Sequence, residues 1–309
     1  MTNKDINDFT LLLNTLNYIS VKDINESSEK WIIEVLNKSL PLFTHLINSY
    51  SLDKIERITI NRRIHGSNKR IKEIKFLKYP PADKVANYGR CNLPKQSILY
   101  ASPLYMTAIS EMQPRVGDLI TKSIWTKKNS KELKLCPIFH IQPTDGSINP
   151  HSWRLEKEFN KLVKQNHPKE QQEIVISLSK FIAYHFSKYV DRQKPKNYLF
   201  SAFFSNKILN DFEGGTIDGI IYPSVRSKLS FENVALKPDV FDLNYQLSEV
   251  HESIITKDPS DGDKGYLMDG LNFSKEFDYE TGEIMWDDSI KQPQERIDFF
   301  KKHFQLDLE

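Results

Sequence analysis

Cysteine is scarce in this 309-residue chain, which has only Cys91 and Cys136. Neither belongs to a C-x-x-C pair, so the sequence argues against a disulfide scaffold and favours a reducing compartment. No apolar run reaches the roughly 20 residues that a helix needs to cross a bilayer, and the first twenty residues do not have the layout of a secretion signal. We therefore predict a cytoplasmic protein that is not inserted in a membrane.

The common catalytic motifs are also missing. The chain contains no G-x-x-x-x-G-K-[ST], no G-x-G-x-x-G and no G-x-S-x-G, which argues against P-loop, Rossmann dinucleotide and α/β-hydrolase sites. His251-Glu252 lacks the second histidine of a zinc protease, and the eight histidines are scattered along the chain. The spacing of Asp258, Asp261 and Asp263 does not match a calcium-binding EF-hand loop. We therefore expect no metal site.

Charge is nearly balanced overall but unevenly distributed. The formal net charge of +2 gives no reason to expect general nucleic-acid binding. Residues 54–95 contain twelve Lys or Arg against three Asp or Glu, whereas residues 251–309 contain fifteen acidic against seven basic residues. The basic stretch could serve an anionic ligand, or it could be a solvated face balanced by the acidic tail.

The hydrophobic periodicity predicts an α+β protein. Residues 1–50 are expected to form a helical extension that Pro41 interrupts, residues 51–250 a catalytic domain, and residues 251–309 an acidic tail packed on that domain or extending it. We predict strands at 97–101, 118–125, 135–141 and 217–222, helices at 153–165, 170–190 and 198–212, and a hairpin around 279–284.

A further helix is predicted directly after the first of these strands. Ser102 is a suitable N-cap and Pro103 a suitable first helical residue, and the helix would end at Gln113-Pro114. With a helical period, one face would carry Leu104, Ala108 and Glu111. A carboxylate on the same face as leucine and alanine lies either at the edge of the core or in a pocket.

Four short motifs occur in a fixed order, preceded by Arg62 and Arg63. They are Gly89-Arg90-Cys91-Asn92, Leu99-Tyr100-Ala101-Ser102, Thr107-Ala108-Ile109-Ser110-Glu111 and Tyr222-Pro223-Ser224-Val225-Arg226. This order, GRxN…LYxS…TAxxE…YPSxR, resembles the RES family, which is named for its Arg, Glu and Ser. The resemblance covers roughly residues 57–247.

The resemblance implies a mixed β core like that of the ADP-ribosyltransferases, with surrounding helices, and an activity that destroys NAD. Members of the family are often toxins that pair with an antitoxin protein. The residues carried over as catalytic are Arg90, Tyr100, Glu111 and Ser224, and those that would bind NAD are Arg62, Arg63 and Arg226. NAD would be a consumed substrate, with no cofactor, no nucleic acid and no metal required.

The residue types also suit this chemistry by themselves. Loss of nicotinamide from NAD develops positive charge on the ribose, which a carboxylate such as Glu111 can stabilise. Arginines such as Arg62 and Arg90 offer paired donors to a diphosphate. Tyr100 could stack on an aromatic ring, and Ser224 could donate a hydrogen bond to the nicotinamide ribose or amide.

Other interpretations stay open at this point. Glu111 could be a solvated helix carboxylate, Arg90 a surface charge, Tyr100 a core residue and Ser224 a turn cap. The same site could transfer ADP-ribose to a protein or nucleic acid. The chain could also be an inactive RES-like module that binds partners, and its oligomeric state is left open.

Overall fold

The computed structural model describes residues 3–20, 24–39, 44–140, 150–259, 265–287 and 293–308. The chain forms two compact units, and each is built from three separate segments. Unit 1 comprises residues 1–50, 81–98 and 132–237, and unit 2 comprises residues 51–80, 99–131 and 238–309. The predicted extension of residues 1–50 is therefore one of three segments of unit 1.

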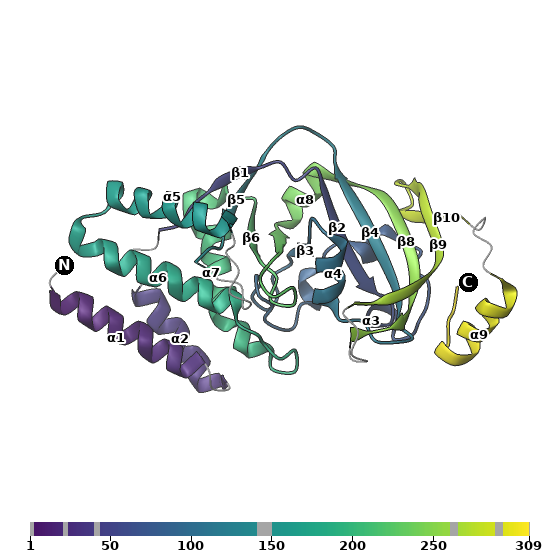
Figure 1. Cartoon of the computed structure of the whole chain (residues 1–309), viewed down its shortest axis with the longest axis horizontal. Coiled ribbons are helices and arrows are strands. Elements are labelled where there is room, and N and C mark those ends of the chain that lie inside the picture. The colour runs from purple at the N-terminus through teal and green to yellow at the C-terminus, as the bar shows by residue number, and fades with distance from the viewer. Residues whose placement is uncertain are drawn as a thin grey trace. The chain divides into compact units, whose positions relative to one another are not determined.

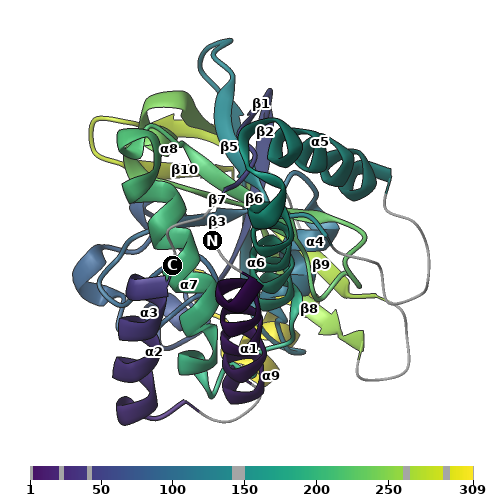
Figure 2. The same ribbon diagram turned by 90° about the vertical axis from the view of Figure 1, so that its left-hand side faces the viewer.

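Three helices of unit 1 pack against α6. The helices of this unit are α1 (Asn3–Ser20), α2 (Glu26–Ser39), α5 (Pro150–Asn166), α6 (Lys169–Ser187) and α7 (Leu199–Asn206), with short 3-10 helices at Ala82–Lys84, Pro195–Tyr198 and Phe212–Gly215. Helices α1, α5 and α7 all contact α6, and Figures 1 and 2 both show α1 beside it. Apolar residues of α6 such as Leu178 and Phe186 are buried because they recur on the helix sides that face these neighbours.

The predicted helices of unit 1 are confirmed, with corrected ends. The third of them ends as an α-helix at Asn206 and continues as a wider π-helical turn, Lys207–Asp211, before Gly214 and Gly215 take positive φ angles. The expectation of a fully helical N-terminus is wrong for β1 (Asn48–Tyr50), which pairs with β5. Pro41 lies outside the described residues.

Unit 1 contains a mixed β-sheet in the order β1-β5-β6-β7. Its further strands are β5 (Leu133–Pro137), β6 (Gly219–Pro223) and β7 (Glu232–Leu236). Strands β5 and β6 are parallel, whereas β1/β5 and β6/β7 are antiparallel. The close approach of β7 requires glycine at position 219, because a Cβ there would lie 2.5 Å from the Ala235 carbonyl oxygen.

Unit 2 is organised around an antiparallel sheet in the order β10-β9-β8-β4-β2. The strands are β2 (Lys54–Ile60), β4 (Leu119–Lys127), β8 (Tyr245–Lys257), β9 (Leu267–Asp278) and β10 (Glu283–Asp287). The predicted hairpin is confirmed as β9–β10, where the Asp278 carboxylate accepts the amides of Glu280 and Thr281, and Gly282 has a φ of 79°.

The remaining elements of unit 2 pack around this sheet. They are β3 (Leu99–Ala101), α3 (Arg62–His65), α4 (Tyr105–Met112), α8 (Pro238–Asn244), α9 (Gln294–Phe304) and a 3-10 helix at Ile74–Leu77. Figure 1 shows α4 against the sheet near β2, and the two elements are in contact. Helix α9 covers Leu119, Ile254 and Leu271 with Phe300.

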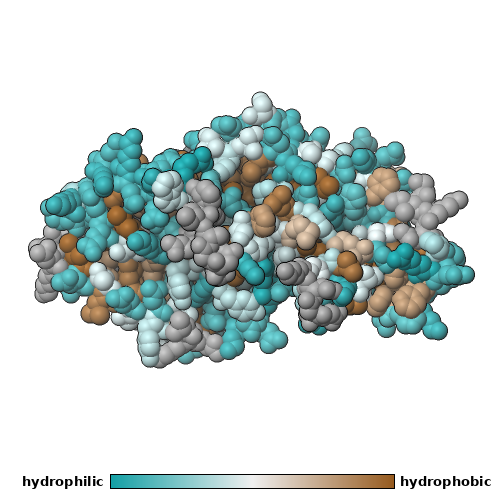
Figure 3. Space-filling view, in the orientation of Figure 1, coloured by the Kyte–Doolittle hydropathy of each residue, from teal (hydrophilic) through white to brown (hydrophobic). Residues whose placement is uncertain are grey.

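The α+β class is thus confirmed, with one mixed and one antiparallel sheet. The face drawn in Figure 3 is mostly hydrophilic, with smaller groups of hydrophobic side chains between the polar ones. None of the helices within the described ranges combines the length and the apolar character needed to span a membrane.

Candidate functional site

Glu111 lies in the last turn of α4, whose start differs from the prediction. The backbone groups of Ser102 pair with those of Glu56 at 2.7 and 2.9 Å, so the chain stays extended through Ser102. Leu104 is also extended, and the helix begins at Tyr105, two residues after the predicted Pro103. Ser102 still contributes at this end, because its hydroxyl accepts the amide of Leu104 at 3.3 Å. The predicted end is confirmed, since Gln113 has a φ of 48°.

Helix α4 packs against the sheet through one face and leaves Glu111 at the edge of that contact. Ala108 and Ile109 are buried against isoleucines of β2, β4 and β8: Ile58, Ile60, Ile120 and Ile255. Leu104 precedes the helix in an extended conformation and is 48% exposed, so the predicted helix face shared by Leu104, Ala108 and Glu111 is wrong. Glu111 is partly exposed and therefore accessible to a ligand from solvent.

Arg63 reaches the same end of α4. Its guanidinium donates to the backbone carbonyl of Met112 at 3.1 Å, and Met112 directly follows Glu111. Arg62 instead forms a paired interaction with the nearly buried carboxylate of Asp118, with Nη2 at 3.1 Å from Oδ2. Strand β2 ends at Ile60, and both arginines lie in α3.

Tyr100 lies in β3 and is partly exposed. Its backbone carbonyl accepts a 2.7 Å hydrogen bond from Nη1 of Arg57 in β2. Burial lowers the pKa of Arg57 to about 10, so this guanidinium is still charged at neutral pH. Its Nε is buried and has no hydrogen-bond partner among the described residues.

Arg57 was not among the sequence-predicted residues. The signal that could have revealed it is an arginine among the regularly spaced isoleucines of Ile55-Glu56-Arg57-Ile58-Thr59-Ile60. Buried cations are costly unless they are paired. A buried cation on a strand therefore indicates either a fixed internal partner or an anionic ligand.

Arg90 belongs to unit 1 and binds the C-terminal end of α6. Its Nη1 lies 2.5 Å from the Phe186 carbonyl and 3.4 Å from the Lys188 carbonyl, and its guanidinium is 5.0 Å from the centre of the Tyr198 ring. These carbonyls lack partners within the helix, and a cation at a helix C-terminus is favourable. Burial, together with Arg90, lowers the pKa of Lys188 to about 8.

Ser224 and Arg226 lie in a turn of unit 1 that packs near the same helix end. Ser224 is fully buried and its hydroxyl accepts the amide of Ser227 at 3.2 Å, which is a turn-capping contact. Arg226 lies over the ring of Tyr189 at 4.2 Å. Arg90 and Arg226 therefore contact residues on either side of Lys188, and form a basic region at the end of α6.

The predicted residues are divided between the two units. Unit 2 contains Arg62, Arg63, Tyr100 and Glu111, and unit 1 contains Arg90, Ser224 and Arg226. Within unit 2 the structure brings Arg63 to the end of the helix that carries Glu111. Within unit 1 it brings the two arginines to neighbouring residues after α6.

No protein-family model matches the chain, and no curated protein matches it. Across the described ranges, no group of three or more His, Cys, Asp or Glu side chains could hold a metal ion.

Proposed function

We propose that this protein is a RES-like enzyme that cleaves the nicotinamide–ribose bond of NAD, with Glu111 as the main catalytic residue. The observation that carries the proposal is the placement of Glu111, a partly exposed carboxylate in the last turn of α4. The guanidinium of Arg63 contacts the residue that follows it. The type of reaction is inferred from the ordered motifs from Arg90 to Arg226, which resemble those of the RES family.

In the proposed reaction, the bond between ribose C1 and the nicotinamide nitrogen breaks, and its electron pair leaves with neutral nicotinamide. The positive charge that develops on the ribose is stabilised by the carboxylate of Glu111. Water then bonds to C1 and loses a proton to solvent, and the products are nicotinamide and ADP-ribose. In unit 2, Arg57 and Arg63 are two cations that could bind the diphosphate.

The proposal includes a fold related to the ADP-ribosyltransferases. An α+β chain with two sheets is compatible with such a fold. The proposal also includes a cytoplasmic toxin that an antitoxin protein restrains. Expression of the wild type alone should then lower cellular NAD and arrest growth, while Glu111→Gln at equal expression should be harmless.

The direct test is to incubate the purified protein with NAD in phosphate-free buffer and to identify the products by mass. Glu111→Gln keeps the size of the side chain but removes its charge, so NAD turnover should fall at least about a hundredfold. Glu173→Gln is the matched control, because Glu173 is an exposed helix carboxylate without a proposed role. Near-normal turnover in Glu111→Gln would show that the assignment is wrong.

The same experiment identifies the acceptor. Free ADP-ribose indicates water, a phosphorylated ADP-ribose after phosphate addition indicates phosphate, and label from NAD on a macromolecule indicates a transferase. We expect water as the default, because the Glu111 carboxylate would repel phosphate. An absolute requirement for phosphate would identify a phosphorylase.

A second candidate function is an inactive RES-like module that binds protein partners. The observation that favours it is that Arg62, Arg90 and Ser224 all have internal partners, namely Asp118, the end of α6 and a turn amide. Undiminished NAD after incubation with the folded wild type would support this candidate over the enzyme.

A further inference from the structure

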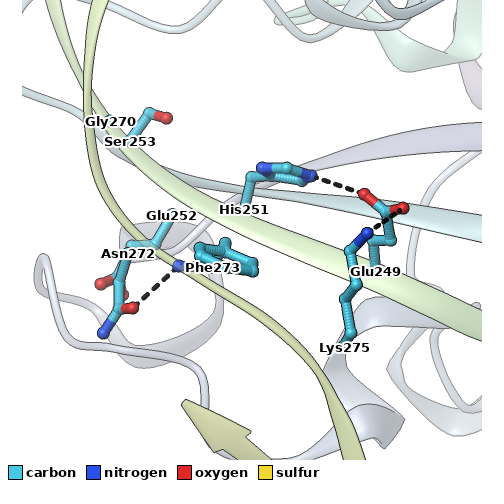
Figure 4. A pocket seen from close by; sticks show the side chains of 8 residues that line it. All are labelled: Glu249, His251, Glu252, Ser253, Gly270, Asn272, Phe273 and Lys275. Atoms are coloured by element: carbon cyan, nitrogen blue, oxygen red, sulfur yellow. Dashed lines mark hydrogen bonds and ion pairs between the residues drawn. The ribbon is translucent and has the colours of Figure 1, made fainter. Parts of the chain in front are cut away.

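Unit 2 has a pocket at β8 and β9, and none of the site residues predicted from the sequence lines it. Its volume is about 390 Å³, within the usual range for small-molecule sites. The register of the two strands shifts between Glu252 and Ser253, where the ladder is irregular. Figure 4 shows the side chains that line it: Glu249, His251, Glu252, Ser253, Asn272, Phe273 and Lys275, with the backbone of Gly270.

The pocket contains aromatic surface beside hydrogen-bonding groups. His251 and Phe273 are cross-strand partners whose ring centres are 6.3 Å apart, with an angle of 27° between the ring planes. The Glu249 carboxylate lies 3.2 Å from His251 Nε2 and 3.2 Å from Lys275 Nζ (Figure 4). A flat ring could stack on either aromatic side chain and present its edge to Glu249 and Lys275.

The charges in the pocket compensate each other. Burial and the nearby Lys122 lower the pKa of His251, which favours the neutral ring. Glu249 and Lys275 form an ion pair, and the carboxylate of Glu252 is bound by Arg70. Among the residues that line the pocket, a free phosphate or a divalent cation would therefore find the opposite charges already paired, whereas a neutral ring with polar edges would meet complementary groups.

We propose that this pocket binds the base of a guanine nucleoside. Guanine presents an acceptor, O6, beside two donors, N1–H and the N2 amino group. Lys275 can donate to O6 while the Glu249 oxygens, which have lone pairs left after their two contacts, accept from N1–H and N2–H. Aromatic stacking with hydrogen bonding along the base edge is the usual way in which proteins recognise a single base.

Gly270 allows a test that leaves the packing of the sheet unchanged. A Cβ built at Gly270 would meet no atom within 4 Å, and its φ is not in the left-handed region. Gly270→Leu should therefore fill the pocket while the protein stays folded. Gly265→Leu is the matched control, because Gly265 has the same open surroundings but does not line the pocket.

The experiment is a calorimetric titration of the whole chain with guanosine up to about 1 mM, the range in which a weak single-site ligand is detectable. We expect saturable binding to the wild type and to Gly265→Leu, and none to a folded Gly270→Leu. Glu249→Gln should weaken binding about tenfold or more, because it replaces a charged acceptor by a neutral amide. Glu276→Gln, an exposed change on β9 next to Lys275, should have no effect.

Two further ligands test which edge of the base the pocket recognises. Inosine lacks the N2 amino group and should bind more weakly than guanosine, and adenosine more weakly still. Equal binding of adenosine, absence of saturable guanosine binding, or unchanged binding in folded Gly270→Leu would each overturn the proposal. Glu111→Gln should bind guanosine normally, so the result does not depend on whether the chain cleaves NAD.

Discussion

The ion pair between Arg70 and Glu252 gives the clearest stability prediction. Glu252 is fully buried in the middle of β8, and Arg70 binds it with Nη2 at 2.8 Å and Nε at 3.1 Å from the same carboxylate oxygen. The guanidinium also lies 5.2 Å from the centre of the Trp286 ring. Removal of one partner leaves the other charge buried without compensation.

Glu252→Ala should therefore lower the free energy of unfolding by about 3–5 kcal/mol, the usual cost of breaking a buried pair. At roughly 2–4 °C for each kcal/mol, the melting temperature of unit 2 should fall by about 6–20 °C. The double variant Arg70→Met/Glu252→Leu should lose less than either single variant, because no charge stays unpaired.

The assay is urea unfolding of the wild type, Glu252→Ala, the single variants Arg70→Met and Glu252→Leu, and the double variant. It is monitored by circular dichroism and by tryptophan fluorescence, to which Trp286 contributes; the indole of Trp286 donates to the Ile71 carbonyl at 3.0 Å. A strictly additive double variant would refute the reasoning, since additivity means that the two side chains do not interact. If Glu252→Ala lowers the free energy of unfolding by less than about 1 kcal/mol, the pair contributes no more than an exposed salt bridge does.

Three further predictions concern single positions. Arg90→Lys should lower the free energy of unfolding by about 1–2 kcal/mol, because one ammonium cannot replace the paired donors at the end of α6; unchanged urea unfolding would contradict this role, and weaker NAD binding would be a separate effect. Gly117→Ala should lower the free energy of unfolding more than Gly66→Ala. Both glycines have positive φ, but only at Gly117 would the new Cβ lie 2.6 Å from the Phe304 ring. Equal urea midpoints for the two variants would show that the ring moves away freely. The buried charge of Lys188 should lower the free energy of unfolding less as the pH rises from about 8 towards the ordinary lysine pKa of 10.5, because over that window the folded protein has lost a proton that the unfolded chain retains. Lys188→Met should therefore gain more stability over the wild type at pH 7.5 than at pH 9.5. A gain that is the same at both pH values would contradict this.

Local signals in the sequence predicted the elements whose cause is local. Helix α4 ends where Gln113 and Pro114 predict, and the β9–β10 hairpin turns at Gly282. The start of α4 was missed because Ser102 is held extended by backbone pairing with Glu56, a residue far away in the sequence. For the same reason β1 was expected to be helical, since only its pairing with β5 makes it a strand.

The candidate site depends still more on long-range partners. The sequence motifs name Arg62, but they do not indicate that Asp118 binds it. Arg57 was missed because its role follows from its burial beside the Tyr100 carbonyl, and burial is decided by the whole sheet. The pocket between β8 and β9 was not predictable, because a shift in strand register leaves no residue pattern of its own.

The division of both units into separate segments has a consequence for how the protein is made. The last segment of unit 1 ends at Lys237, and the last segment of unit 2 begins at Pro238. Until β8 has been synthesised, the pair of strands β2 and β4 lacks the neighbour of β4, while every segment of unit 1 is already complete. Domains generally fold as units during synthesis, so unit 1 should fold first. The helix that carries Glu111 packs against Ile255 of β8, so it gains its complete support only late in translation.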